Sequence, residues 1–147
     1  MHWSAKYVGV PYTDRAERDP YGLDCWQLVA MVLRKEFDIT IPELSYDNSQ
    51  HSEEFYKGFM AQYEAFHADW EKVAQPQEGD LLLILRDRIP AHVGIMLDDK
   101  NFLHTMPKTG AVTHRLSEEW ANRVEGIYRY KQRSSVDGSD RRVPQSI

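Results

Sequence analysis

The feature that most constrains the fold is a change of residue pattern after the turn-forming segment Pro76-Gln77-Glu78-Gly79-Asp80. Short apolar runs follow it, separated by Gly, Pro, Asp, Asn and charged residues, which is typical of strands. The gaps between the runs are too short for the helical crossovers that parallel strands need. The sequence therefore predicts a mostly antiparallel sheet. Its expected strands are Leu81–Leu85, His92–Leu97, Asn101–Thr105, Ala111–Leu116 and Gly126–Tyr130.

The residues before this point show helical spacing instead. Apolar side chains recur at helical intervals from Cys25 to Phe37, with Asp24 placed to cap the helix and Pro42 placed to close it. A second region, about 52–72, spaces aromatic residues by four, four and three, and we expect an amphipathic helix that covers the fold. Helices followed by an antiparallel sheet predict the α+β class.

Composition and net charge argue against two classes of partner. The 147 residues suit one globular domain, and a net charge of -5 supplies no basic field for nucleic acid or for an anionic membrane. We therefore expect neither as a partner. The single cysteine cannot form an internal disulfide.

The two ends of the sequence give further expectations. Residues 132–147 form a polar tail that we expect to be disordered, which leaves residues 1–131 as a single domain. The first residues lack a basic stretch followed by an apolar run, so we expect synthesis in the cytoplasm without a signal peptide. A substrate outside the cytoplasm would then need another route of delivery.

Cys25 stands at the expected start of the first helix. There, unpaired backbone N–H groups and the positive end of the helix dipole stabilise a thiolate, which is the nucleophilic form of cysteine. The same N–H groups can stabilise the oxyanion that forms when a thiolate attacks a carbonyl. The alternative is a small buried core residue, because free cysteine is among the most buried residue types.

His92 and His104 lie on neighbouring expected strands. In an antiparallel pair, directly opposite residues share a face, and their numbers add to a constant. Two even-numbered residues such as His92 and His104 can share a face only if that constant is even. The two imidazoles therefore share a face only if the turn between them holds an odd number of residues, centred near Asp98. In that case His92 can exchange a proton with Cys25 while His104 orients its ring.

Metal binding is the rival interpretation of the same residues. Cys25, His92, His104 and His114 are possible zinc ligands. The sequence contains no Cys-x-x-Cys, His-x-x-x-His or His-Glu-x-x-His pair, so we expect neither a metal nor another cofactor.

Several short segments together resemble the NlpC-type cysteine peptidases, in order and spacing, from about residue 7 to residue 130. The segments are Gly9-Val10-Pro11-Tyr12, Gly22-Leu23-Asp24-Cys25 with Leu28-Val29, Ile41-Pro42, Glu78-Gly79-Asp80-Leu81, His92-Val93-Gly94-Ile95 and Phe102-Leu103-His104. The resemblance implies a papain-like α+β domain over residues 1–131. It also implies hydrolysis of amide bonds in the stem peptides of peptidoglycan, commonly between D-glutamate and diaminopimelate.

The resemblance also implies roles for individual residues. Cys25 matches the family's nucleophile, His92 its base and His104 the polar residue that orients the base. Tyr12 matches a tyrosine near the oxyanion site. Asp24 matches an aspartate associated with the substrate's free amine, although capping the helix explains Asp24 equally well.

Two departures from the family pattern concern specificity. Most members follow the cysteine with Ser-Gly, whereas this chain has Trp26-Gln27, which places Trp26 among the candidate substrate-binding residues. The family's serine is tied to substrate recognition, so the resemblance does not by itself fix the cleavage position in this chain. The glycine pair expected after Tyr12 is replaced by a charged run over residues 13–20.

The Asp-Cys-Trp variant resembles the subset of the family found with phage tails, where the enzyme opens the cell wall during entry. We therefore expect a phage tail or delivery to the periplasm as its location, with tail proteins as candidate partners. A delivered antibacterial effector shares these features. The same fold would also suit a catalytically silent tail-assembly or adaptor protein, or a thiol amidase or acyltransferase.

Overall fold

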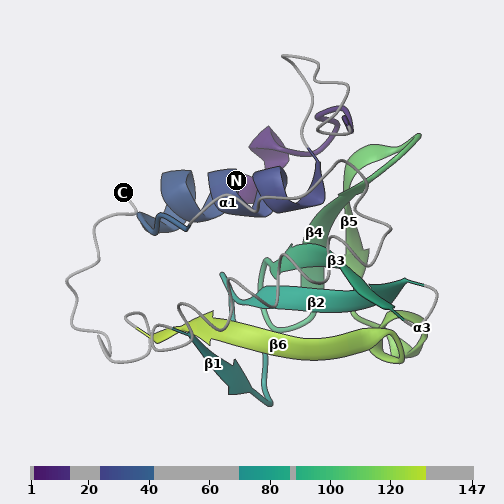
Figure 1. The fold of residues 1–147 in the computed structure, drawn as a ribbon. Coiled ribbons are helices and arrows are strands. Elements are labelled where there is room, and N and C mark those ends of the chain that lie inside the picture. The colour runs from purple at the N-terminus through teal and green to yellow at the C-terminus, as the bar shows by residue number, and fades with distance from the viewer. Residues whose placement is uncertain (1, 14–23, 42–69, 87–88, 132–147) are drawn as a thin grey trace.

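The structure, a computed structural model, describes residues 2–13, 24–41, 70–86 and 89–131. Helix α1 lies across one face of an antiparallel six-stranded sheet with strand order β1-β6-β2-β3-β4-β5 (Figure 1). The helical elements are the 3-10 turn η1 (Trp3–Lys6), α1 (Cys25–Phe37) and α3 (Glu118–Ala121). The strands are β1 (Trp70–Val73), β2 (Leu81–Arg86), β3 (Ile89–Met96), β4 (Asn101–Met106), β5 (Gly110–Arg115) and β6 (Val124–Tyr130).

This architecture confirms the predicted α+β class and the antiparallel sheet. Each of the five expected strands corresponds to one of β2 to β6, with ends that differ by at most three residues. The expected helix over 52–72 was wrong at its end, because residues 70–72 belong to β1, which pairs with β6. The rest of that helix lies outside the described residues, as does the expected tail over 132–147. Within the described residues, no helix has the length and hydropathy that a membrane crossing requires.

Helix α1 begins where the sequence predicts. The side chain of Asp24 accepts a hydrogen bond from the amide of Gln27, whose own side chain accepts one from the amide of Asp24. This reciprocal capping box satisfies amides that the first turn would otherwise leave unpaired. The predicted end was wrong, because the helix stops at Phe37. Asp38 takes the left-handed conformation there (φ 60°), which ends the helix well before Pro42.

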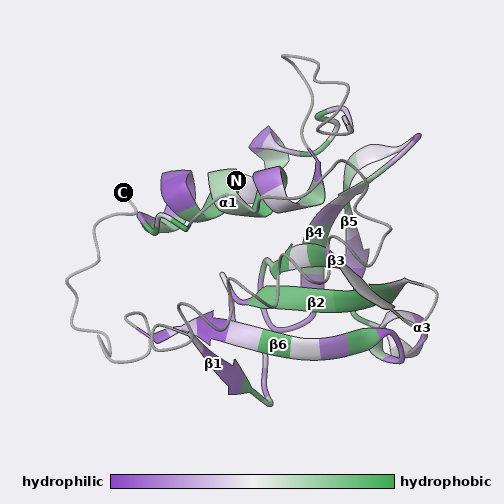
Figure 2. Cartoon of the chain, viewed as in Figure 1, coloured by the Kyte–Doolittle hydropathy of each residue, from purple (hydrophilic) through white to green (hydrophobic). Residues whose placement is uncertain are grey.

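The sheet separates two apolar clusters. The larger lies between the sheet and α1, and includes Leu81, Leu83, Val93, Ile95 and Leu103. The smaller lies on the opposite face, where Leu82, Ile84, Met96 and Phe102 pack with Trp120 of α3 and its neighbours. Figure 2 shows β2 as hydrophobic along most of its length, because its side chains are buried on both faces. Alternating strand residues therefore feed two separate cores.

The N-terminal segment runs beside the outer strand β5. The amide of Gly9 donates to Ala111 O at 2.8 Å, and the amide of Ala111 donates to Val10 O at 2.9 Å. The approach is close: a Cβ on Gly110 would stand 2.7 Å from Val10 O, and Gly110 also has φ +73°. These bonds tie the N-terminal segment to the start of β5.

A buried ion pair joins the start of β2 to the end of β6. Arg129 Nε lies 2.9 Å from Asp80 Oδ1, and Arg129 Nη2 lies 2.8 Å from Asp80 Oδ2. Asp80 is fully buried and also accepts a hydrogen bond from the amide of Gln77. These bonds raise the pKa of Arg129, so the guanidinium stays charged. The pair holds the two strands in register at the turn that precedes β2.

The turn between β3 and β4 is tight and polar. The amide of Leu97 donates to Asn101 O, which leaves residues 98–100 as the turn. Asp98 Oδ1 accepts hydrogen bonds from the amides of Lys100 and Asn101, and these bonds lower the pKa of Asp98. The side chain therefore remains an anionic acceptor that fixes the turn.

We predict that Arg129→Leu lowers the free energy of unfolding by about 3–5 kcal/mol, because it leaves the Asp80 carboxylate buried without its cation. Urea unfolding followed by circular dichroism measures the change. The control is Arg115→Leu, which removes an exposed arginine from β5 and should change stability by less than about 0.5 kcal/mol. Equal losses in the two variants would contradict a structural role for the ion pair.

We predict that Gly94→Ala destabilises the protein by about 1–3 kcal/mol, as is typical of overpacking. The new Cβ would stand 3.1 Å from Leu103 O and 3.2 Å from the Phe102 ring, and both are held in the buried sheet. The control is Thr113→Ser, an exposed change on β5, which should alter stability by less than about 0.5 kcal/mol. Thermal unfolding of both variants tests this, and an equal or larger loss in Thr113→Ser would show the prediction to be wrong.

Candidate active site

Two of the predicted site residues are in direct contact. His92 on β3 and His104 on β4 are buried, and His92 Nε2 lies 2.9 Å from His104 Nδ1. The rings meet edge to face, with centroids 5.1 Å apart. His104 therefore fixes the rotation of the His92 ring, and the other His92 nitrogen, Nδ1, faces away from this bond.

The parity expected for this contact is confirmed. Ile95 pairs with Leu103 and Met96 with Phe102, so the numbers of paired residues add to an even constant. The turn is centred on Asp99 rather than Asp98, and this register places His104 beside Gly94 rather than His92. A Cβ on Gly94 would stand 3.3 Å from His104 Cβ, so the missing side chain lets His104 approach β3.

The two histidines meet where the strands have stopped pairing. The ladder between β3 and β4 holds only the pairs Ile95–Leu103 and Met96–Phe102. Beyond these pairs the strands still lie close at Gly94, and the bond between His92 and His104 joins them through side chains. The two imidazoles thus continue the contact between β3 and β4 where the backbone ladder has ended.

Cys25 is the first residue of α1, and α1 packs against β3 and β4, the strands that carry the two histidines. The thiol thus lies in the first turn, near the positive end of the helix dipole, as predicted. The side chain is fully buried and belongs to the cluster between α1 and the sheet. Its position suits a stabilised thiolate, and its burial limits the access of solvent.

Asp24 is fully buried, and its side chain caps α1. The capping role expected for it is confirmed, whereas binding of a substrate amine stays a prediction. Because Asp24 holds the amide of Gln27, that amide does not belong to an oxyanion site. The amide of Cys25 itself is the first-turn donor nearest the thiol along the chain.

Tyr12 lies two residues beyond Val10, on the segment that is tied to β5. This places it at the end of the β4–β5 hairpin where Met106 pairs with Gly110. The side chain is half-buried. Its role at the oxyanion stays a prediction.

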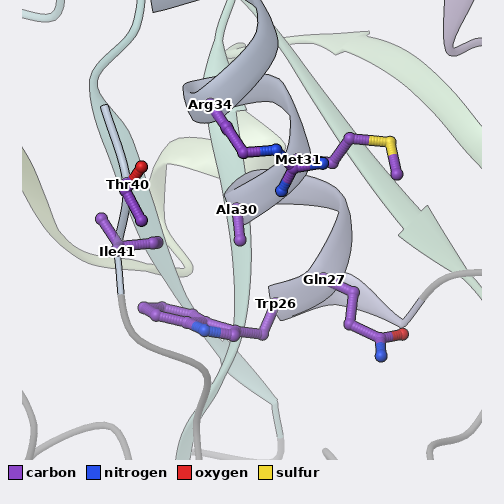
Figure 3. Close-up of a pocket in the computed structure, with 7 residues that line it drawn as sticks. All are labelled: Trp26, Gln27, Ala30, Met31, Arg34, Thr40 and Ile41. Atoms are coloured by element: carbon purple, nitrogen blue, oxygen red, sulfur yellow. The ribbon is translucent and has the colours of Figure 1, made fainter. Parts of the chain in front are cut away.

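Trp26 differs from the other candidates, because it lines a pocket on the flank of α1. The pocket has a volume of about 200 Å³. Figure 3 shows the Trp26 indole beside Ile41, which with Thr40 comes from the segment after the helix, and Arg34 further along the same side of α1. Trp26 itself is fully buried. Trp26, which follows Cys25 in the sequence and replaces the family's serine, therefore forms one wall of this pocket.

The sequence interpretation missed the role of His114, which it weighed only as a zinc ligand. His104 Nε2 lies 2.8 Å from His114 Nδ1, so three imidazoles form a chain from β3 through β4 to β5. The same parity argument would have found it: β4 pairs with β5 from Asn101–Arg115 to Met106–Gly110, so even-numbered residues of the two strands share a face.

The ring nitrogens of this chain bond to each other instead of converging on one point. Among the residues that the structure describes, no group of three or more His, Cys, Asp or Glu side chains is arranged to hold a metal ion. The geometry is that of a hydrogen-bonded relay.

Comparisons with solved structures find the same fold in other proteins. Three solved structures share the fold over 86% of this chain. A lipoprotein-like NLP/P60 family protein of Staphylococcus aureus has a TM-score of 0.58 at 23% identity, and an NlpC/P60 family protein of Bacillus cereus has 0.60 at 21%. The NlpC/p60 domain of the peptidoglycan hydrolase SagA has 0.56 at 21%.

The extent of these matches differs. The chain spans 38% of the S. aureus protein and 37% of the B. cereus protein, but 92% of the SagA domain. No curated protein sequence matches the chain. The model of the NlpC/P60 family matches residues 9–129, which include every candidate site residue. The chain therefore belongs to the NlpC/P60 family.

Proposed function

We propose that this protein is a cysteine peptidase that hydrolyses amide bonds in the stem peptides of peptidoglycan. The observation that carries the proposal is the oriented pair of His92 and His104 on the two strands against which the Cys25 helix packs. Membership of the NlpC/P60 family supports the same chemistry, since its members are generally cysteine peptidases or peptidoglycan hydrolases. One solved relative in fold is named as a peptidoglycan hydrolase.

In the proposed mechanism, the Cys25 thiol passes its proton to His92 Nδ1, because His92 Nε2 is engaged by His104. The thiolate attacks the amide carbon at the start of α1, and the amide of Cys25 donates to the oxyanion. The His92 imidazolium then protonates the leaving amine. Water that gives its proton to His92 releases the acyl group as a carboxylic acid, which restores the thiol and the neutral imidazole.

The bond between D-glutamate and diaminopimelate is the proposed cleavage site. Trp26, in the place of the family's serine, lines the pocket beside α1, so this pocket is the part of the surface most suited to change the preferred stem peptide. The association with phage tails stays a prediction from the Asp-Cys-Trp segment. None of the three matched structures carries that association in its name.

A catalytically silent adaptor is the second candidate, and one observation favours it. Cys25 is fully buried, whereas a nucleophile must reach its substrate. Under this alternative the fold serves only in binding. The thiol would then react with iodoacetamide no faster than a free thiol does at neutral pH.

We predict that the wild-type protein cleaves the stem peptides of purified peptidoglycan and releases soluble peptide fragments, and that Cys25→Ala releases none. Mass spectrometry of the products identifies the new amine and carboxyl ends, and so the bond cleaved. It also separates a peptidase from a thiol amidase or acyltransferase. Circular dichroism must show that Cys25→Ala keeps the fold.

The matched control for this experiment is His2→Ala, which removes an imidazole from the exposed N-terminal turn and should leave the product pattern unchanged. Undiminished release by Cys25→Ala would end the proposed mechanism. A wild-type protein that releases nothing and whose thiol is unreactive would favour the adaptor.

A further inference from the structure

We propose that His114 is a positioning residue: it sets the direction of the hydrogen-bonded chain and thereby keeps a proton off the Nδ1 of His92. This inference rests on the proposed function, because it concerns how His92 becomes a base. The chain consists of two bonds, His92 Nε2 to His104 Nδ1 at 2.9 Å and His104 Nε2 to His114 Nδ1 at 2.8 Å.

The number of protons in the chain limits how its rings can be arranged. Each bond between two imidazoles holds one proton, and each neutral ring carries one, so neutral rings all donate in the same direction along the chain. If His114 accepts at Nδ1, then His104 carries its proton on Nε2 and accepts at Nδ1. His92 in turn carries its proton on Nε2, and its Nδ1 is a lone-pair base.

The reverse direction disables the base. If His114 donates from Nδ1, then His104 must donate from its own Nδ1 to His92 Nε2. The proton of a neutral His92 is then on Nδ1, and the ring cannot accept another from Cys25 there. The tautomer of His114 on β5 thus decides whether His92 on β3 can act, although the two residues are not bonded to each other.

The surroundings of His114 favour the productive direction. His92 and His104 are buried, whereas His114 is partly exposed and can donate a proton from Nε2 to water. With its proton on Nε2, His114 presents the lone pair of Nδ1 to His104. An imidazole chain that ends at solvent also gives the buried pair a route for proton exchange.

Aromatic packing holds the end of the chain in place. The Trp120 ring lies 5.1 Å from both His104 and His114, and the Phe102 ring lies 4.7 Å from His104. A charged group on this side is Arg123, whose guanidinium stacks 4.9 Å from the Trp120 ring. The rings therefore keep the orientation in which their nitrogens meet.

The test compares two variants of similar polarity. In His114→Asn the amide oxygen can take the place of Nδ1 and accept from His104, whereas in His114→Gln the amide lies one atom further out, at the place of Nε2. Nitrogen NMR of the histidine side chains reports the tautomer of His92. The pH profile of Cys25 alkylation by iodoacetamide reports the thiolate. Thr113→Ala, an exposed change on the same strand, is the control.

We expect His114→Asn to keep His92 protonated on Nε2 and to keep the wild-type alkylation profile. We expect His114→Gln to mix the tautomers and to slow alkylation at neutral pH by about tenfold, the order typical of lost outer-shell partners. Identical behaviour of the two variants, or a wild-type His92 with its proton on Nδ1, would overturn the proposal. If the buried thiol resists alkylation in every variant, the NMR result alone decides.

These readouts do not depend on cell-wall hydrolysis. If the wild-type protein leaves peptidoglycan intact but shows the expected tautomers, the proposed function is rejected and the proposed role of His114 is supported. Hydrolysis that is equal in His114→Asn and His114→Gln, with unchanged tautomers, would keep the function and reject the relay.

Discussion

The hydrogen bond between His92 and His104 is the interaction on which the site depends. It forms where the backbone pairing of β3 and β4 has ended. There a hydrogen bond between side chains joins the strands in place of backbone hydrogen bonds. Its geometry requires an odd turn between the strands and a glycine at position 94, which lets His104 approach. The Cys25 helix packs on these two strands. The register and the glycine thus bring two imidazoles together within an apolar sheet.

Much of this arrangement follows from patterns that act over short distances. Alternation along a strand, parity across a turn and an Asp before an apolar helix each depend on a few neighbouring residues. For this reason the helix start at Cys25, the antiparallel strands and the shared face of His92 and His104 could all be predicted. The catalytic roles of these residues came from the resemblance to a known family, because the spacing of apolar residues carries no information about chemistry.

The parts that could not be predicted depend on tertiary context. Strand β1 has four residues and takes its conformation from pairing with β6, so the preceding aromatic spacing misassigned it. The end of α1 is set by Asp38 in a left-handed conformation, which is less common for aspartate than for glycine. The role of His114 could not be predicted, because sequence shows residue types and not the direction of their lone pairs.

The proposed mechanism requires that Cys25 form a covalent acyl intermediate with a stem peptide. The most direct test is the intact mass of the protein after acid quenching of a reaction with a purified muropeptide, followed by mapping of the modified residue. The mechanism predicts an adduct with the mass of the acyl portion, located on Cys25 and lost on treatment with hydroxylamine. Turnover of the muropeptide with no adduct on Cys25, in a reaction quenched during steady state, and with full activity in Cys25→Ala, would contradict it.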